Sequence, residues 1–277
     1  PPAAPASAPS APGAGLFGLP GLTWERLGWC VLFLAAVWLR FHALGEKPLH
    51  HDESLHAFYA WNLFQGKGYA YDPMMHGPFL FHANALIYYF FGATDFTARI
   101  LPAAMSVLCV VMAYLLRPYL GRAGALFTAA LFTLSPAFTY FGRFIRNDIY
   151  IAAFSLVMLW ALFRYLDTRR PGFLYAGAAA LSLAFCTKEV TYIIGFIFVS
   201  ILFFRWLWET SARPAPEEQR FTPVFKSLIT VRRPLWISTL IFFGIVAVLY
   251  TTVFTHPRGF FDAFTKSLTY WLGQHEV

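Results

Sequence analysis

Residues 172–204 read GFLYAGAAALSLAFCTKEVTYIIGFIFVSILFF, an apolar run whose only charged residues are Lys188 and Glu189. As a single helix the run would be about 50 Å long, whereas the hydrocarbon core of a bilayer is about 30 Å thick. The charged dipeptide therefore predicts the turn of a hairpin between two membrane-spanning helices. The stretch indicates a polytopic membrane protein rather than a soluble one.

The rest of the chain extends this pattern. Hydrophobic residues make up 58% of the sequence and charged residues 13%, about half the charged share of a soluble protein. Helices long enough to cross a bilayer are expected at seven places. We therefore predict an all-α, polytopic transmembrane helix bundle over residues 24–254, with spans at 24–41, 100–116, 123–141, 149–166, 172–187, 190–204 and 235–254.

The net charge of +7 reports topology. With the N-terminus in the cytoplasm, the inner segments hold 12 basic and 5 acidic residues, and the outer segments hold 9 of each. Lys and Arg are concentrated in cytoplasmic loops, and this orientation places the whole excess there. We therefore expect an integral protein of the inner (plasma) membrane with its active face extracytoplasmic. The basic excess does not indicate a nucleic-acid partner.

Four further segments complete the predicted organisation. Residues 1–23 form a Pro/Ala-rich tail that we expect to be disordered. An outer loop, 43–99, contains two juxtamembrane amphipathic helices at 56–64 and 78–91. A cytoplasmic linker covers 209–234. Residues 255–277 predict an outer interfacial segment, after which we expect the native protein to continue.

The strongest candidates for chemistry are Asp52 and Glu53, which follow His50 and His51 on the outer side. Adjacent carboxylates at a membrane face can act as a general base and as a ligand for a metal or an acceptor. Asp52 also suits a helix N-cap, so a purely structural role stays open.

A second candidate group lies at the outer start of the fourth span. Arg143 and Arg146 could bind a phosphate. Asp148 lies on the same side of the membrane as Asp52, so two outer carboxylate sites could converge above the bundle. The alternative is that Asn147 or Asp148 caps the helix while the arginines reach toward lipid headgroups.

Two shorter motifs lie on the same side. Lys188 is a candidate phosphate ligand, although Lys188 and Glu189 could simply pair with each other in the turn. His76 precedes Gly77 and Pro78, where Pro also suits the first turn of a helix.

Taken in order, these pieces resemble the membrane-embedded GT-C glycosyltransferases, in the branch of protein mannosyltransferases and aminoarabinose transferases. The resemblance covers most of residues 24–277. The landmarks are Asp52-Glu53 after the first span, the two juxtamembrane helices, the His76-Gly77-Pro78 segment, the RILPA sequence at 99–103 and the spacing from Arg143 to Asp148. The segments HHDESLHAFYAWNLFQGKGYAYDPMMHGPF and WLGQHEV are similar to a bacterial and archaeal subfamily named for an association with flippase activity.

The resemblance implies transfer of a sugar from a polyprenyl-phosphate donor to an acceptor on the outer face. It implies a GT-C-like N-terminal module in which Asp52 is the base, Glu53 positions acceptor or metal, and Asp148 shapes the pocket. Arg143, Arg146 and Lys188 would neutralise the lipid phosphate, with His76 and His51 as further binding residues. Asp52 and His76 are candidate ligands for a divalent metal, Mg²⁺ or Mn²⁺. The expected partners are membrane lipid and the polyprenyl-phosphate-linked sugar.

Two other functions fit the sequence. The first is a non-catalytic GT-C-like subunit that braces a larger membrane protein complex and therefore has protein partners. The second is a lipid-sugar flippase, which would require polar residues deep within several spans. The spans contain almost no charge at mid-membrane, which disfavours the flippase.

Overall fold

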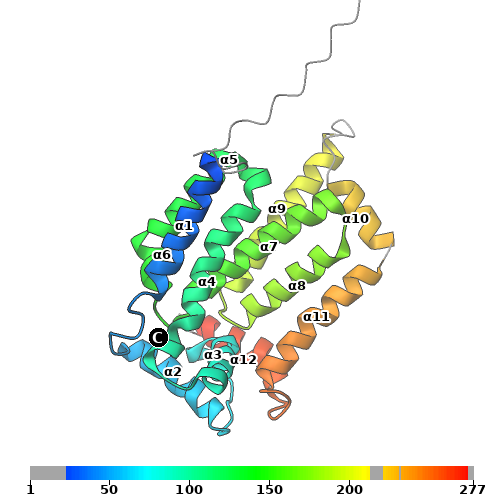
Figure 1. The fold of residues 1–277 in the computed structure, drawn as a ribbon. Coiled ribbons are helices and arrows are strands. Elements are labelled where there is room, and N and C mark those ends of the chain that lie inside the picture. The colour runs from blue at the N-terminus through cyan, green and yellow to red at the C-terminus, as the bar shows by residue number, and fades with distance from the viewer. Residues whose placement is uncertain (1–22, 213–220, 231, 274–277) are drawn as a thin grey trace, which may run out of the picture.

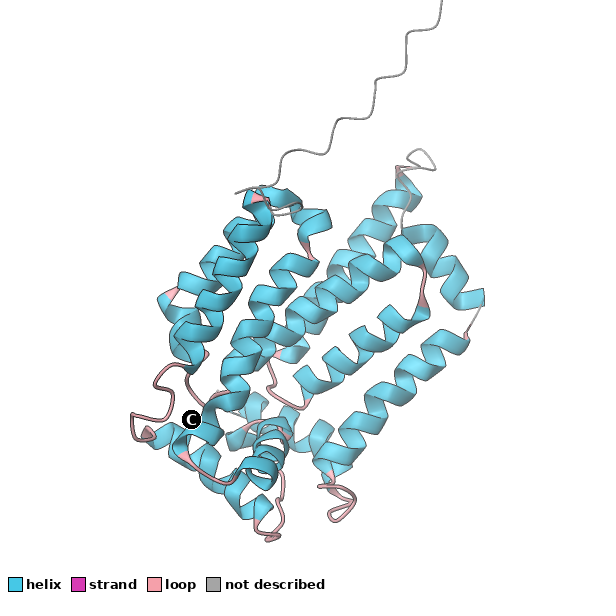
Figure 2. Cartoon of the chain, in the orientation of Figure 1, coloured by secondary structure: helices cyan, strands magenta, loops and turns pink. Residues whose placement is uncertain are grey.

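The computed structural model describes residues 23–212, 221–230 and 232–273 (Figure 1). The expected tail at 1–23 therefore lies outside the described residues, apart from Thr23. Within the described part of the chain, the regular elements are helices and no strand occurs (Figure 2). The elements are α1 Trp24–Phe41, α2 His51–Phe64, η2 Pro73–Met75, α3 Phe79–Phe91, α4 Asp95–Leu115, α5 Arg117–Leu134, α6 Pro136–Phe141, α7 Asp148–Thr168, α8 Pro171–Phe185, α9 Thr191–Ser211, α10 Phe221–Thr230, α11 Arg233–Tyr250 and α12 Gly259–Gly273.

The predicted all-α membrane bundle is confirmed. Each of the seven expected spans corresponds to helical structure, and the first, α1, has the predicted bounds. Four of the described helices, α4, α7, α9 and α11, are long and apolar enough to cross a membrane, and α8 is a shorter apolar helix. The hairpin between α8 and α9 is also present, with Lys188 and Glu189 in its turn.

The third expected span, 123–141, is not a continuous helix. It is divided at Ser135 into α5 and α6, because Pro136 has no N–H to donate to the carbonyl of Phe132. The fully buried Arg40 of α1 supplies the missing donors. Its guanidinium bonds to the Phe132 carbonyl and, at 2.6 Å, to the Thr133 carbonyl, so α1 is tied to the break.

We call one end of the bundle the α2/α12 end. There α2, α3 and α12 gather where α1 finishes and where α4 and α7 begin, while α10 lies at the opposite end (Figure 1). The expected juxtamembrane helices are thus present as α2 and α3, although α2 starts earlier than predicted. The largest buried cluster, which includes Phe81, Tyr150 and Phe185, joins these helices to α7 and α8.

The linker expected at 209–234 contains a helix that the sequence analysis did not predict, α10. The buried carboxylate of Glu209 in α9 accepts hydrogen bonds from the backbone amides of Phe221 and Thr222 at its start. The amides of a first helical turn have no partner within the helix, so Glu209 takes the place of a cap.

Candidate active site

The first turn of α2 separates the two adjacent acids. His50, rather than Asp52, caps this helix: its Nδ1 accepts from the Asp52 amide, and Glu53 accepts from the His50 amide in return. Neighbouring residues on a helix point about 100° apart. Glu53 therefore turns into the protein, where it is 2% exposed, while the Asp52 side chain is 41% exposed.

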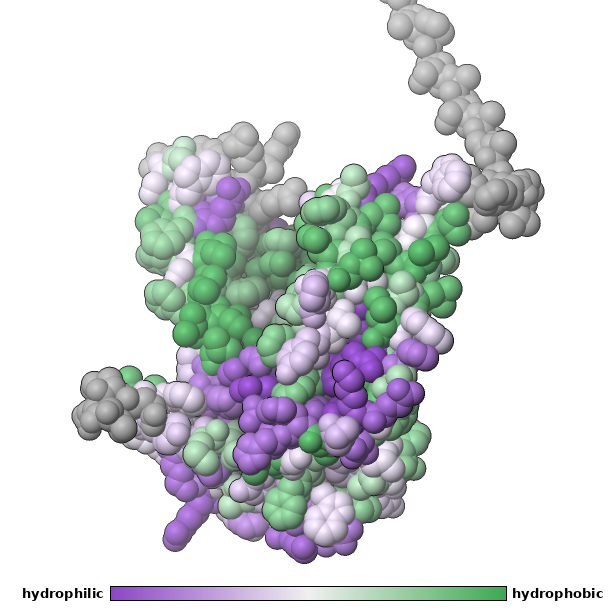
Figure 3. Space-filling view, turned by 90° about the vertical axis from the view of Figure 1, so that its left-hand side faces the viewer, coloured by the Kyte–Doolittle hydropathy of each residue, from purple (hydrophilic) through white to green (hydrophobic). Residues whose placement is uncertain are grey.

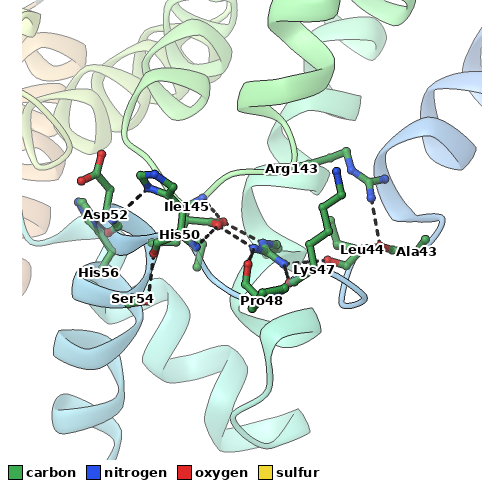
Figure 4. A network of polar contacts seen from close by, with 12 residues as sticks. Ala43, Leu44, Lys47, Pro48, His50, Asp52, Ser54, His56, Arg143 and Ile145 are labelled. Carbon is green, nitrogen blue, oxygen red and sulfur yellow. Dashed lines mark hydrogen bonds and ion pairs between the residues drawn. The ribbon is translucent and has the colours of Figure 1, made fainter.

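Glu53 is held in a buried network (Figure 4). Its carboxylate accepts from Arg99 Nε at 2.8 Å and Nη2 at 2.6 Å, and from the amides of His50 and Ile145. Burial opposes ionisation, but these hydrogen bonds outweigh it and hold the pKa of Glu53 below its usual range. These contacts do not support the expected role in positioning acceptor or metal, because four hydrogen bonds already engage the carboxylate.

Arg143 also differs from its expected role. Its guanidinium donates to the carbonyls of Leu39, Arg40 and His42 from Nη1 and to that of Ala43 from Nη2. These carbonyls lie at the end of α1 and have no partners within the helix. Arg143 thus holds the end of α1, and it does not line the cavity that contains Asp52.

Four of the remaining candidates line one cavity of about 220 Å³, which we call the polar cavity: Asp52, His76, Arg146 and Lys188. Asp52 Oδ2 lies 3.2 Å from Arg146 Nη1, Arg146 Nε lies 4.0 Å from Asp148 Oδ2, and Lys188 Nζ lies 2.8 Å from Asp148 Oδ1. Opposite charges thus alternate across α2, α7 and the α8–α9 turn. Asp52 and Asp148 thus both lie beside Arg146, which is the convergence expected from the sequence.

His76 is fixed opposite these groups by a close backbone contact. The Gly77 amide donates to the Thr187 carbonyl at 3.1 Å, and a Cβ on Gly77 would lie 2.2 Å from the Cys186 carbonyl oxygen. Only glycine allows this approach. As a result, His76 Nδ1 lies 2.7 Å from Glu189 Oε2, and Lys188 and Glu189 pair with different elements rather than with each other.

A second, apolar space adjoins the polar cavity. This apolar groove has a volume of about 500 Å³ and runs between the α8–α9 turn and α12, where Trp271 stacks on His76 at 5.7 Å between ring centroids. His76 and Lys188 line both spaces. The rest of the groove is mainly apolar, formed by Val190, Tyr192, Ile193, Leu268, Trp271 and Leu272 with Glu189 and Ser267.

Two polar residues that line the polar cavity, His56 and Asn147, were not proposed as site residues from the sequence. His56 lies four residues after Asp52 on α2, and its Nδ1 donates to the Asp52 carbonyl at 2.7 Å. Burial lowers the pKa of His56, so the ring is neutral at pH 7 and Nε2 is an acceptor. Asn147 is 3% exposed, and its Oδ1 has no hydrogen-bond partner. The helical spacing from Asp52 could have identified His56, whereas Asn147 was considered only as a possible helix cap.

The metal prediction gains no support from the donor set. Asp52 and His76 both line the polar cavity, but the described residues contain no group of three or more His, Cys, Asp or Glu side chains that could hold a metal ion. We therefore derive no step through a metal. His51 is exposed at the start of α2 and does not line the polar cavity.

The family model for dolichyl-phosphate-mannose-protein mannosyltransferase matches residues 75–216, which are 142 of the 277 residues. The chain belongs to this family. The match confirms the expected resemblance and includes His76, Arg146, Asp148 and Lys188, whereas Asp52 precedes it. No curated protein matches the chain.

Solved structures support the same fold. The chain is similar to the protein O-mannosyltransferase Pmt1-Pmt2 complex of S. cerevisiae bound to the sugar donor, with 17% identity and a TM-score of 0.62 over 90% of this chain and 34% of that one. It is also similar to ArnT from Cupriavidus metallidurans in the apo state, with 20% identity and a TM-score of 0.63 over 85% of this chain and 44% of that one. For ArnT from the same organism bound to undecaprenyl phosphate, the identity is 21% and the TM-score is 0.63, over 86% of this chain and 44% of that one. The chain thus spans less than half the length of these proteins.

Proposed function

We propose that the protein transfers a glycosyl group from a polyprenyl-phosphate-linked donor to a nucleophilic acceptor in the polar cavity. The observation that carries this proposal is the junction of the polar cavity and the apolar groove at His76 and Lys188. A polyprenyl-phosphate sugar is divided in the same way, into an apolar chain, an anionic phosphate and a polar sugar. The polyprenyl chain of the donor would occupy the apolar groove, with the phosphate near Lys188 and the sugar toward Asp52.

The relatives support this class of donor. Similar solved structures are described as bound to undecaprenyl phosphate and to the sugar donor, and the family description names a dolichyl-phosphate sugar. We further propose that the cavity faces the extracytoplasmic side, because the orientation that places it there also places the excess of Lys and Arg in the cytoplasm.

The charges of the polar cavity suit the reaction. The acceptor oxygen or nitrogen forms a bond to the anomeric carbon, and the bond from that carbon to the phosphate oxygen breaks. Asp52 takes the acceptor proton, and the phosphate leaves with the electron pair. Arg146 and Lys188 stabilise the negative charge that develops on the phosphate, and this stabilisation is strongest where water is partly excluded. Arg146 lies against Asp52, so phosphate binding to Arg146 would free the carboxylate to act as base.

The proposal predicts that catalysis and donor binding separate between two variants. Asp52→Asn should lower release of polyprenyl phosphate from polyprenyl-phosphate mannose by about 10²- to 10⁴-fold while undecaprenyl phosphate still binds. Lys188→Ala should weaken undecaprenyl phosphate binding itself. Both are measured with the whole protein in proteoliposomes, and a tryptophan fluorescence melt checks folding.

The matched control is Asp262→Asn, which removes a carboxylate paired with Lys266 on α12, outside the polar cavity. It should leave both readouts unchanged. Full activity in Asp52→Asn would contradict the assigned base. Unchanged binding in Lys188→Ala would contradict the assigned phosphate site. The absence of any turnover together with intact binding in the unsubstituted protein would favour the non-catalytic subunit instead.

A further inference from the structure

A further cavity lies at the α2/α12 end, separate from both the polar cavity and the apolar groove. It has a volume of about 530 Å³ and lies between α6 and the chain that joins α1 to α2. The two cavities share no lining residue. In Figure 4, Asp52 and His56 lie on one side of the view, and Lys47 and Arg143 lie on the other. We call it the α1–α6 cavity.

The charges of this cavity favour an anion. Three cationic side chains, Lys47, Arg99 and Arg143, line it, against the single carboxylate of Glu53. Arg99 neutralises that carboxylate through two hydrogen bonds, so the lining carries a net charge of +2 with histidine neutral. The polar cavity differs, because there the cations already face Asp52 and Asp148.

The unused polar groups of the α1–α6 cavity are donors. Arg143 donates from Nη1 and from one hydrogen of Nη2 to backbone carbonyls, and its Nε has no described partner. Lys47 is exposed, and within the described residues its ammonium group makes no ion pair. The Nδ1 of His50 accepts from the Asp52 amide, so the neutral ring carries its proton on Nε2. Such a set matches phosphate oxygens, which only accept when ionised.

The remaining wall is apolar and aromatic. Tyr140 of α6 stacks on Phe144 with ring centroids 5.2 Å apart, and Tyr140 is 56% exposed. On the face of the molecule in Figure 3, hydrophilic side chains gather over the lower part and border a hydrophobic surface above. A ligand here would meet cationic donors beside apolar surface, which is the environment of a lipid headgroup at the membrane boundary.

We propose that the α1–α6 cavity binds the phosphate of an anionic phospholipid, with its glycerol and upper acyl carbons against Tyr140 and Phe144. This binding is independent of glycosyl transfer, since the two cavities have no lining residue in common. Its consequence is structural: Arg143 holds the end of α1, so an occupied cavity would hold α1 against α6 beside the active site.

The test compares lipid retention by native mass spectrometry of the whole protein in neutral detergent. Phosphatidylglycerol should be retained at least about tenfold more than phosphatidylcholine, and Lys47→Glu should lower this ratio about tenfold. Lys67→Glu is the matched control, because Lys67 is an exposed lysine at the same end and does not line the cavity. Tyr140→Ala tests the apolar wall and should weaken phosphatidylglycerol retention without changing binding of inorganic phosphate.

Three results would overturn the proposal. The first is equal retention of the two lipids, and the second is an equal loss of phosphatidylglycerol retention in Lys47→Glu and Lys67→Glu. The third is complete displacement of phosphatidylglycerol by millimolar inorganic phosphate, which would make free phosphate the occupant. Asp52→Asn should retain phosphatidylglycerol normally, which separates this site from the proposed transfer reaction.

Discussion

At the scale of single residues, the polar cavity depends on how each side chain is turned rather than on which residues are present. Asp52 and Glu53 are neighbours, yet one faces the cavity and the other is sealed against Arg99. Lys188 and Glu189 are neighbours, yet one meets Asp148 and the other His76. Each pair of adjacent charges therefore serves two different elements, and the functional unit is the set that converges from α2, α7 and the α8–α9 turn.

His56 offers a test at this scale. Its Nδ1 is occupied by the Asp52 carbonyl, and burial lowers its pKa, so the neutral ring should persist as the pH falls through about 6.5. Protonation at lower pH would place a third cation beside Arg146 and Lys188. We expect activity to hold until the pH passes below the ordinary histidine range and then to fall.

The His56 prediction is checked with a pH profile of polyprenyl phosphate release. His56→Gln keeps a polar side chain but cannot titrate, so it should remove the acidic fall that belongs to this residue. The matched control is His42→Gln, at the end of α1 and outside the polar cavity. If His56→Gln retained the same acidic limb, the titrating group would be another residue.

At the scale of elements, the ion pair formed by Glu53 and Arg99 ties α2 to α4. Arg99 is 4% exposed, and it also donates to the carbonyls of Leu44, Lys47 and Pro48. The pair thus fastens both the start of α2 and the segment before it. Asp52 immediately precedes Glu53, so the same pair sets where the proposed base lies.

Arg99→Met should lower the free energy of unfolding by about 3–5 kcal/mol, because it leaves a buried carboxylate without its counter-ion. Glu53→Gln combined with Arg99→Met should recover part of this loss, since no charge then remains buried. Thermal unfolding in detergent measures both. Equal stability of the single and double variants would contradict the coupling.

Acid should weaken the unsubstituted pair. The pKa of Glu53 lies below its usual range, so the stabilisation is present at neutral pH and is lost as the pH falls through that lowered pKa.

The helices could be predicted from the sequence because apolar length and helical periodicity are local properties. The start of α2 could not be placed, because His50 acts as its cap and histidine is not a usual capping residue. The break at Ser135 was also missed, although Pro136 marked it. Of the site, the convergence of Asp52 and Asp148 could be predicted from topology alone. The roles of Glu53 and Arg143 could not, since their partners are Arg99 and backbone carbonyls of α1, distant along the chain.

At the scale of the whole molecule, the two ends of the bundle differ in charge. The end that carries α10 includes the basic residues that we assign to the cytoplasm, while the α2/α12 end holds both cavities (Figure 1). A lipid-linked substrate requires a polar site level with the membrane boundary, and the α2/α12 end provides one beside an apolar groove. Orientation in the membrane therefore determines on which side the proposed reaction occurs.

Cysteine labelling tests this orientation. In a Cys30→Ala background, Cys109 and Cys186 are buried, so a new cysteine reports its own exposure. Lys67→Cys, after α2, should react with a membrane-impermeant maleimide in intact cells, whereas Arg122→Cys, near the start of α5, should react only after permeabilisation. We expect this pattern because Lys and Arg are concentrated in cytoplasmic loops, and the opposite orientation would place 12 basic residues outside. The reverse labelling pattern would place the polar cavity in the cytoplasm, where a donor phosphate would be met from the inner leaflet, and the proposed extracytoplasmic transfer would be wrong.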